Sequence, residues 1–157
     1  MAYRVYYDKV STGTTATELV FFAHNEADDG ELVTNLASDN QLPEDFTLER
    51  IELIVPPTIA IADAEKLAKG VMKIKIGTDE PLKLPVALAF SDNTISVYAE
   101  PGNTGTAEYV EAKGTLGGVQ LAEALTIPAN TKFNIYVELP SAFGTDTELI
   151  MCLHGRA

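Results

Sequence analysis

Short segments in which apolar and polar residues alternate occur along most of the chain and constrain its fold more than any other feature. The clearest segment spans residues 132–139, where phenylalanine, isoleucine, valine and leucine alternate with lysine, asparagine, tyrosine and glutamate. Because successive side chains of a β-strand point to opposite faces, this alternation predicts a strand with one buried face. Residues 47–56 and 72–76 show the same pattern, and a Pro-Pro pair and a Gly-Thr-Asp turn follow them.

Weaker alternation predicts five further strands, over residues 17–24, 84–90, 94–100, 107–126 and 148–154. A single helix is predicted over residues 58–70, with a cap at Thr58, a left-handed end at Gly70 and an apolar stripe of Ile61, Ala64, Leu67 and Ala68. Residues 25–46 form a polar connection that is too long for a hairpin turn. We expect a surface excursion with a short helical turn there.

These elements add up to eight strands with turn residues between them and no strand–helix–strand rhythm. They predict an all-β fold, an eight-stranded antiparallel sandwich of the single jelly-roll type, with one short helix in a crossover. Residues 1–15 are expected to form an N-terminal arm and residues 16–157 a single jelly-roll domain. The arm alternates over residues 2–10 and is interpreted as either a ninth strand or a mobile extension.

The composition fits one globular domain and excludes several functional classes. The chain has 157 residues, of which 46% are hydrophobic. This is enough to form a hydrophobic core that needs no disulfides or structural metal ions. With 11 Lys and Arg against 23 Asp and Glu, it lacks the clustered cations that binding to nucleic acid requires. Its single cysteine, Cys152, excludes an internal disulfide and is expected to act as a small buried apolar residue. The first eight residues do not resemble a secretory signal, and no apolar stretch approaches the roughly 20 residues that span a bilayer.

Few residues could carry chemistry. His24 and His154 are the only imidazoles, each at the end of a predicted strand, and nothing in their spacing requires them to converge. An acidic segment with Asp28, Asp29 and Glu31 could supply oxygen ligands to Ca²⁺, but it lacks the EF-hand spacing, and a solvated acidic loop is the favoured interpretation. The sequence contains neither a glycine-rich phosphate-binding motif nor the Gly-x-Ser-x-Gly motif of a nucleophile elbow. We therefore expect no cofactor and no enzymatic activity.

Several segments of the chain carry motifs of a known protein family. Residues 40–53 read Asn-Gln-Leu-Pro-Glu-Asp-Phe-Thr-Leu-Glu-Arg-Ile-Glu-Leu, after Thr-Asn-Leu at 34–36, and residues 72–77 read Met-Lys-Ile-Lys-Ile-Gly, before Leu-Pro at 84–85. These segments resemble capsid proteins of tailless icosahedral bacteriophages, which often show a Gln-Leu-Pro turn, a strand, a helix and a strand that ends near glycine. Residues 125–135 and 149–156 resemble their last strands. The resemblance implies a single jelly roll, whereas many of these shells use a fused double one.

Residues at the two ends of the chain are the expected contact residues. Tyr3, Tyr6 and Tyr7 offer a large contact area at low entropic cost, which suits a strand that adds to the sheet edge of a neighbouring subunit. Pairing of the arm with its own sheet is the alternative. His154 and Arg156 are further candidates, and histidines at a subunit contact would make assembly sensitive to pH near about 6.5.

The expected function is mechanical. We expect a viral (phage) capsid structural protein that self-assembles or co-assembles into an icosahedral shell through many modest contacts. Its partners would be copies of itself and other capsid proteins of the virion, without direct contact to nucleic acid. An internal membrane is compatible with the sequence but is not indicated by it. The expected location is the virion, after synthesis in the host cytoplasm. The alternatives are a decoration or cement protein and a spike-associated binding module with a β-sandwich fold.

Overall fold

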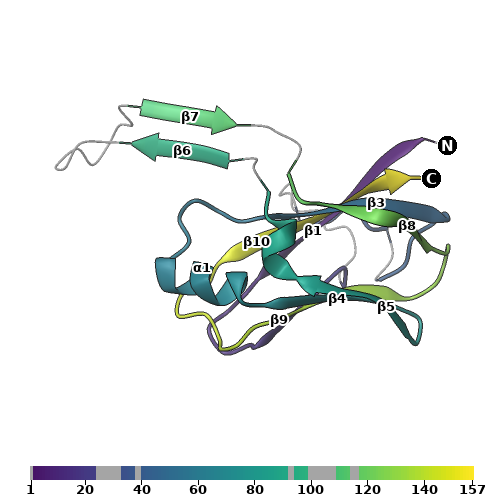
Figure 1. Cartoon of the computed structure of the whole chain (residues 1–157), viewed down its shortest axis with the longest axis horizontal. Helices are drawn as coiled ribbons and strands as arrows, with labels where there is room; N and C mark the ends of the chain where they lie inside the picture. The colour runs from purple at the N-terminus through teal and green to yellow at the C-terminus, as the bar shows by residue number, and fades with distance from the viewer. Residues whose placement is uncertain (1, 24–32, 38–39, 92–93, 99–108, 114–116) are drawn as a thin grey trace.

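A computed structural model describes residues 2–23, 33–37, 40–91, 94–98, 109–113 and 117–157 (Figure 1). The strands in this part of the chain are β1 (Tyr3–Ser11), β2 (Glu18–Phe21), β3 (Phe46–Ile54), β4 (Val71–Ile76), β5 (Asp79–Pro85), β6 (Thr94–Tyr98), β7 (Tyr109–Lys113), β8 (Val119–Ile127), β9 (Phe133–Glu138) and β10 (Glu148–Arg156). The helix α1 spans Ile61–Ala68, and the 3-10 helix η1 spans Val86–Ala89.

Eight of these strands form two four-stranded antiparallel sheets. The first sheet has the order β1–β10–β3–β8, and the second sheet has the order β2–β9–β4–β5. Most consecutive strands lie in different sheets, so the chain repeatedly crosses between the two layers, as it does in the eight-stranded jelly roll. The predicted single jelly roll is therefore confirmed, and α1 lies in the crossover from β3 to β4. The strands β6 and β7 pair with each other in a separate hairpin that projects from the sandwich (Figure 1).

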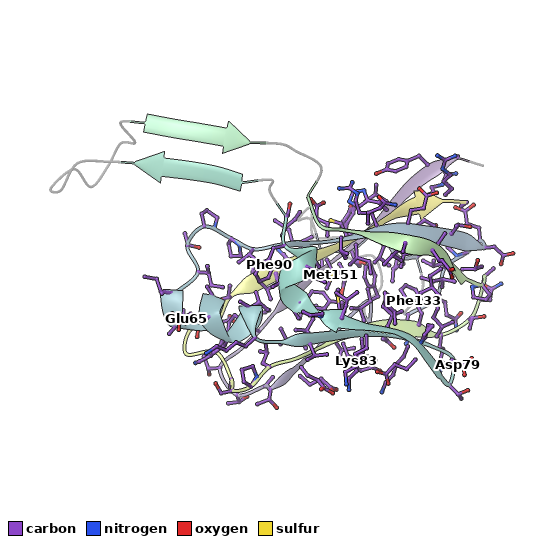
Figure 2. All side chains as sticks on the ribbon, viewed as in Figure 1. Glu65, Asp79, Lys83, Phe90, Phe133 and Met151 are labelled. Atoms are coloured by element: carbon purple, nitrogen blue, oxygen red, sulfur yellow. The ribbon has the colours of Figure 1, made fainter. Side chains whose placement is uncertain are left out.

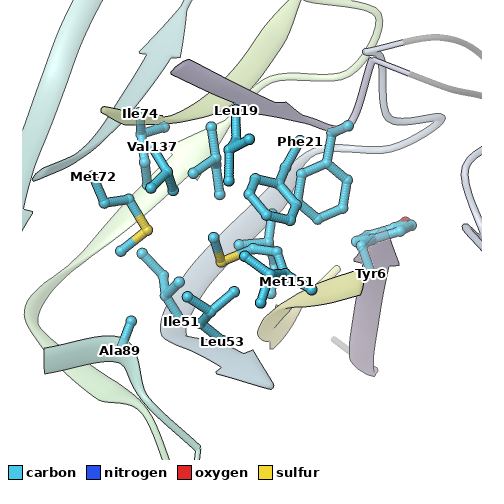
Figure 3. Packing of buried hydrophobic residues seen from close by; sticks show 14 of the residues in the cluster. Tyr6, Leu19, Phe21, Ile51, Leu53, Met72, Ile74, Ala89, Val137 and Met151 are labelled. Carbon is cyan, nitrogen blue, oxygen red and sulfur yellow. The ribbon is translucent and has the colours of Figure 1, made fainter. Parts of the chain in front are cut away.

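The hydrophobic core lies between the inner faces of the two sheets (Figure 3). In β9, Phe133, Ile135 and Val137 are buried, while the residues between them are partly exposed, as the alternation predicts. The rings of Tyr6 and Phe46 meet edge to face with their centroids 5.1 Å apart. Each fully buried large apolar side chain stabilises the fold by roughly 1.5–3 kcal/mol relative to an exposed one.

Residues 3–11 of the predicted arm form β1, the edge strand of the first sheet, in antiparallel register with β10 over their whole length. The outer edge of β1 is covered by residues 33–35. The Lys9 N–H donates to the carbonyl of Val33 at 2.6 Å, and the Asn35 side chain bonds the backbone of Val5 and Tyr7. The arm thus pairs with its own sheet, and its edge between residues 5 and 9 is already hydrogen-bonded within the chain.

The polar connection at 25–46 is only partly described. Residues 33–37 and 40–45 contain no helical turn, so the predicted turn is not found in this described portion. Leu36 and Leu42 are fully buried in the core. The connection is therefore more than a surface excursion, because these two leucines fill space under the edge of the sandwich.

Two predicted strands have different boundaries in the structure. The strand predicted over 84–90 begins earlier, at Asp79, because a tight turn at Gly77 (φ 60°) leads directly into β5. It ends at Pro85, which lacks the N–H that a continuing ladder needs, and η1 follows. The segment predicted over 107–126 is divided into β7 and β8. Gly118 has φ 86° and lies against β3, where a Cβ would collide with the carbonyl oxygen of Ile51.

The helix is shorter than predicted, and of the expected stripe only Leu67 is buried while Ala64 is partly buried. It begins after Ala60 rather than at a Thr58 cap, and Ile61, expected in the buried stripe, is 82% exposed. The buried residues are Asp63 and Leu67. Asp63 faces inward because its carboxylate accepts hydrogen bonds from the backbone N–H groups of Gly144 (2.8 Å) and Thr145 (3.1 Å).

Gly70 does not end the helix in the left-handed conformation, since the positive φ angles of the described residues lie elsewhere. Its lack of a side chain serves a close approach instead. A Cβ on Gly70 would lie 2.9 Å from the carbonyl oxygen of Glu138 in β9. The glycine therefore allows the chain to pass from α1 into β4 directly beside β9.

Candidate functional site

A polar cluster lies on the outer face of the first sheet, where β10 and β3 run side by side. In β10, Met151 and Leu153 point into the core, so Cys152 and His154 lie on the outer face. The register places Cys152 opposite Glu52 and His154 opposite Arg50 of β3. Two strands far apart in the sequence thereby bring an imidazole, a carboxylate, a guanidinium and a thiol together.

His154 occupies the centre of this cluster. Its Nε2 lies 3.1 Å from Oε1 of Glu52, a residue that is only 3% exposed. Its Nδ1 lies 2.5 Å from the Tyr3 hydroxyl and 3.1 Å from Nη2 of Arg50. Because a carboxylate can only accept and a guanidinium can only donate, the proton of the neutral ring is on Nε2, and Nδ1 is the acceptor.

The same side chains hold the base of the β6–β7 hairpin. Before the hairpin, Ser91 donates its hydroxyl to Oε2 of Glu52 (2.6 Å) and its N–H to the carbonyl of Leu53 (2.9 Å). After the hairpin, the carbonyl of Gly117 accepts from Nη1 of Arg50 at 2.6 Å. Both ends of the insertion are therefore fixed to β3. We refer to Tyr3, Arg50, Glu52, Ser91 and His154 as the His154 cluster.

The electrostatics of the cluster favour a carboxylate beside a neutral imidazole. Burial acts to raise the pKa of Glu52, but hydrogen bonds from Ser91 and His154, with the charge of Arg50, bring it below its usual value. Burial lowers the pKa of His154, and Arg50 lowers it further, against the opposing effect of Glu52. Burial and the neighbouring Glu52 raise the pKa of the Cys152 thiol to about 12.

The side chains of this cluster can hold nearby backbone in place, and His154 can titrate. Their hydrogen bonds do not leave a side chain free to transfer a proton to a substrate. Both nitrogens of His154 are hydrogen-bonded within the cluster, and the Ser91 hydroxyl donates to Glu52 instead of to the imidazole. A serine or cysteine nucleophile needs an adjacent base or a lowered pKa. Cys152 is buried, and its raised pKa keeps it as a thiol.

An open hollow of about 470 Å³ adjoins the cluster. Its lining consists of Tyr3, Glu49, Arg50, Gly117, Gly118, Gln120 and His154. The hollow thus lies over the start of β1 and the middle of β3, next to the point where the chain returns from the β6–β7 hairpin.

The structure brings together three of the five contact residues expected from the sequence. Tyr3 bonds His154, and Arg156 lies opposite Tyr3 in the register and pairs with Glu49 at 3.3 Å. Tyr7 lies on the outer face, opposite Cys152. Tyr6 is instead a core residue, since the alternation of β1 turns it inward, where its hydroxyl donates to Glu44 at 3.2 Å.

The remaining candidates, His24, Asp28, Asp29 and Glu31, lie outside the described residues. The residues missed by the sequence analysis are Arg50, Glu52 and Ser91. The alternation of β3 correctly assigns Arg50 and Glu52 to the polar face, and only the contacts with β10 and with the segments flanking the β6–β7 hairpin show that Glu52 is buried there.

Searches for other kinds of site add little. In the described part of the chain, no group of three or more His, Cys, Asp or Glu side chains could hold a metal ion. Neither helix among the described elements has the length and apolar character needed to cross a membrane. No protein-family model, no curated protein and no solved structure matches this chain.

Proposed function

We propose that this chain is a structural protein of a virus particle, a single jelly roll that associates with copies of itself, or with other capsid proteins, in an icosahedral shell. The observation that carries the proposal is the strand order, β1–β10–β3–β8 facing β2–β9–β4–β5. It supports the proposal together with the resemblance of residues 34–53, 72–85, 125–135 and 149–156 to capsid proteins of tailless icosahedral bacteriophages.

The architecture suits a building block whose function is mechanical. The two sheets share one continuous core, so loads applied at one end of the sandwich are carried by packed side chains and by antiparallel ladders. The β6–β7 hairpin projects beyond the sandwich and is fixed at its base by the His154 cluster (Figure 1). In a closed shell each contact can be modest, because closure multiplies the number of contacts per subunit.

The charge of the chain bears on its place in the particle. At a formal net charge of −12, the protein as a whole repels the phosphates of a packaged genome. We therefore propose that it lies on the outside of the shell, or that a lipid layer or another protein separates it from the nucleic acid.

The test is assembly of the purified chain. Light scattering and negative-stain electron microscopy over a concentration series, with and without Ca²⁺, should show particles of uniform size that dissolve on dilution. Reversible dissolution distinguishes assembly from aggregation. A monomer at millimolar concentration would contradict self-assembly. A small stable oligomer that binds only to shells of another protein would identify a decoration protein instead.

A further inference from the structure

The outer face of the second sheet gathers lysines that are scattered in the sequence. In β4, Met72 and Ile74 are buried, so Lys73 and Lys75 lie on the outer side. Lys83 of β5 is the direct cross-strand partner of Lys73. Figure 2 shows Lys83 on the outer side of this layer, directed away from the first sheet.

Lys132 joins these residues from the start of β9, beside Gly77, whose N–H donates to the Lys132 carbonyl at 2.7 Å. We refer to Lys73, Lys75, Lys83 and Lys132 as the lysine face. It holds four of the 11 cationic residues of a chain that has 23 acidic ones.

The contacts on this face leave positive charge in excess. Lys73 forms an ion pair with Glu138 at 2.5 Å, and Nζ of Lys75 lies 4.6 Å from the ring centroid of Tyr136. Among the described residues, Lys75, Lys83 and Lys132 have no carboxylate within ion-pair distance. Like charges directly opposite each other on neighbouring strands are destabilising, so the Lys73–Lys83 pair costs the isolated subunit free energy that an anionic partner would recover.

Two further carboxylates belong to the surroundings of this face. Glu18 is the cross-strand neighbour of Glu138 on the far side of β9, and Glu80 lies near the start of β5. Both act on Lys73 through charge only, after the direct contact with Glu138. Glu138 also acts on Lys83 and Lys75 through charge, but its direct ion pair is with Lys73. Lys75 and Lys83 are therefore the lysines of this face that a carboxylate of a partner could still contact directly.

We propose that the lysine face is a docking surface for a carboxylate-rich surface of a second copy of this chain. This inference rests on the proposed function and specifies one of its contacts. The second copy is favoured as the occupant because the rest of the chain is strongly acidic, so the complementary charge is present on every subunit. Two lysine faces repel each other, so the contact joins different surfaces of the two copies. Such a heterologous contact builds rings or extended lattices instead of closed dimers.

The test compares lysine variants of the full-length chain in the assembly assay. Lys83→Glu reverses the charge on the face, and Lys83→Arg keeps it. Lys69→Glu makes the same change in net charge at an exposed position at the end of α1 that does not belong to the lysine face. We expect Lys83→Glu to raise the concentration at which assembly begins by about tenfold or more, while Lys83→Arg and Lys69→Glu stay near the wild type.

Ionic strength provides a second measurement on the same proteins. Raising the salt concentration from about 0.1 M to about 1 M shortens the screening length from about 10 Å to about 3 Å, which should delay wild-type assembly and leave Lys83→Glu little changed. Because Lys83→Glu places a carboxylate opposite Lys73, it should not destabilise the subunit, and a melting curve of the monomer verifies this.

The outcomes separate this inference from the proposed function. If the wild type assembles and Lys83→Glu assembles equally well, the docking surface is overturned and the structural function stands. If both Glu variants are delayed equally, net charge is responsible and the inference also fails. If the wild type does not assemble at all, self-assembly is contradicted and this inference fails with it, while co-assembly with another capsid protein is still open to test. If Lys83→Glu loses binding to a short DNA duplex while its assembly is unchanged, the occupant is a nucleic acid and the inference is overturned.

Discussion

The outer faces of the two sheets both carry charged side chains, but they hold these charges in opposite environments. On the first sheet, Glu52 is buried, and His154 is hydrogen-bonded to both Glu52 and Arg50. On the second sheet, Lys75 and Lys83 are exposed. Both faces arise from the same alternation of apolar and polar residues. The alternation determines which side chains face the core and which face outward. Whether the outward charged side chains are buried and hydrogen-bonded or exposed then depends on which segments pack over them.

The covering of the first face comes from the chain segments next to the β6–β7 hairpin. Ser91 and Gly117 bond Glu52 and Arg50, and a Cβ on Gly118 would lie 2.9 Å from Cα of Glu52. Removing one partner from a buried, hydrogen-bonded charge pair is costly, whereas an exposed pair contributes little. Carboxylates on the two faces should therefore differ greatly in what their loss does to stability.

The largest effect is expected in the reactivity of Cys152, which reports on the covered face. Its pKa of about 12, against the ordinary value of 9.0, leaves about a thousandfold less thiolate near neutral pH. We expect a disulfide reagent to label the folded protein at least about a thousandfold more slowly than the urea-unfolded chain. Cys152 is the only cysteine, so the absorbance change reports on it alone. Labelling of the folded protein at the rate of the unfolded chain would show that this face is open.

The next effect compares one carboxylate from each face. Glu52→Ala leaves the Ser91 hydroxyl and His154 Nε2 without their acceptor and removes the negative charge near Arg50, and we expect it to lower the free energy of unfolding by about 3 kcal/mol. Glu138→Ala removes a partly exposed ion pair with Lys73 and should change stability very little. Urea unfolding monitored by circular dichroism measures both. Equal losses in the two variants would contradict the contrast between the faces.

The dependence of stability on pH should also be traceable to the covered face. Because the pKa of His154 is lowered below 6.5 in the folded protein, the unfolded chain takes up this proton first as the pH falls. The His154 contribution is therefore complete above about pH 6.5 and is lost below it, by at most about 1.4 kcal/mol per pH unit. The lowered pKa of Glu52 adds a second loss that begins below its usual value of 4.5.

A matched pair of variants assigns the first of these losses. His154→Gln keeps a side-chain N–H for Glu52 but cannot titrate, so unfolding curves between pH 7.5 and pH 5.5 should lose the dependence described above. His24→Gln removes the other imidazole and should retain the pH dependence of stability that is assigned to His154. If His24→Gln abolishes the dependence and His154→Gln does not, the assignment to the His154 cluster is wrong. Protonation would also turn Nδ1 into a donor facing Arg50, so the protection of amides near Gly118 against hydrogen exchange, relative to their intrinsic rates, should fall at low pH.

The general fold could be predicted from the sequence because strand alternation is a local property. Residues 132–139 alternate without interruption, and β9 is found where they lie. The buried face of the helix, in contrast, depends on contacts between distant residues. Ile61 was predicted to be buried, but the inward face of α1 is decided by the bonds from Asp63 to a loop about 80 residues later in the chain.

Only part of the candidate site could be predicted from the sequence, because its contacts also join distant residues. The sequence offered Tyr3 and His154 as contact residues, since an aromatic arm and a rare imidazole are conspicuous by themselves. Arg50 and Glu52 looked like ordinary solvated residues of a half-buried strand. Their partnership with His154 spans more than 100 residues and follows from the β3–β10 register, including the irregularity between His154 and Gly155 in β10. No local pattern specifies such a register.

The smallest expected effect concerns the stability of the exposed face. Lys83→Glu exchanges a repulsive cross-strand pair with Lys73 for an attractive one, so the monomer should unfold at a slightly higher urea concentration. Lys73 already has Glu138 as a partner, which limits the gain, and high salt should remove it by screening. Lys83→Gln serves as the control, because it relieves the repulsion without adding attraction and should fall between the other two. A clear loss of stability in Lys83→Glu would mean that Lys83 has a structural partner within the subunit. Its charge would then not be available to pair with a carboxylate of another subunit.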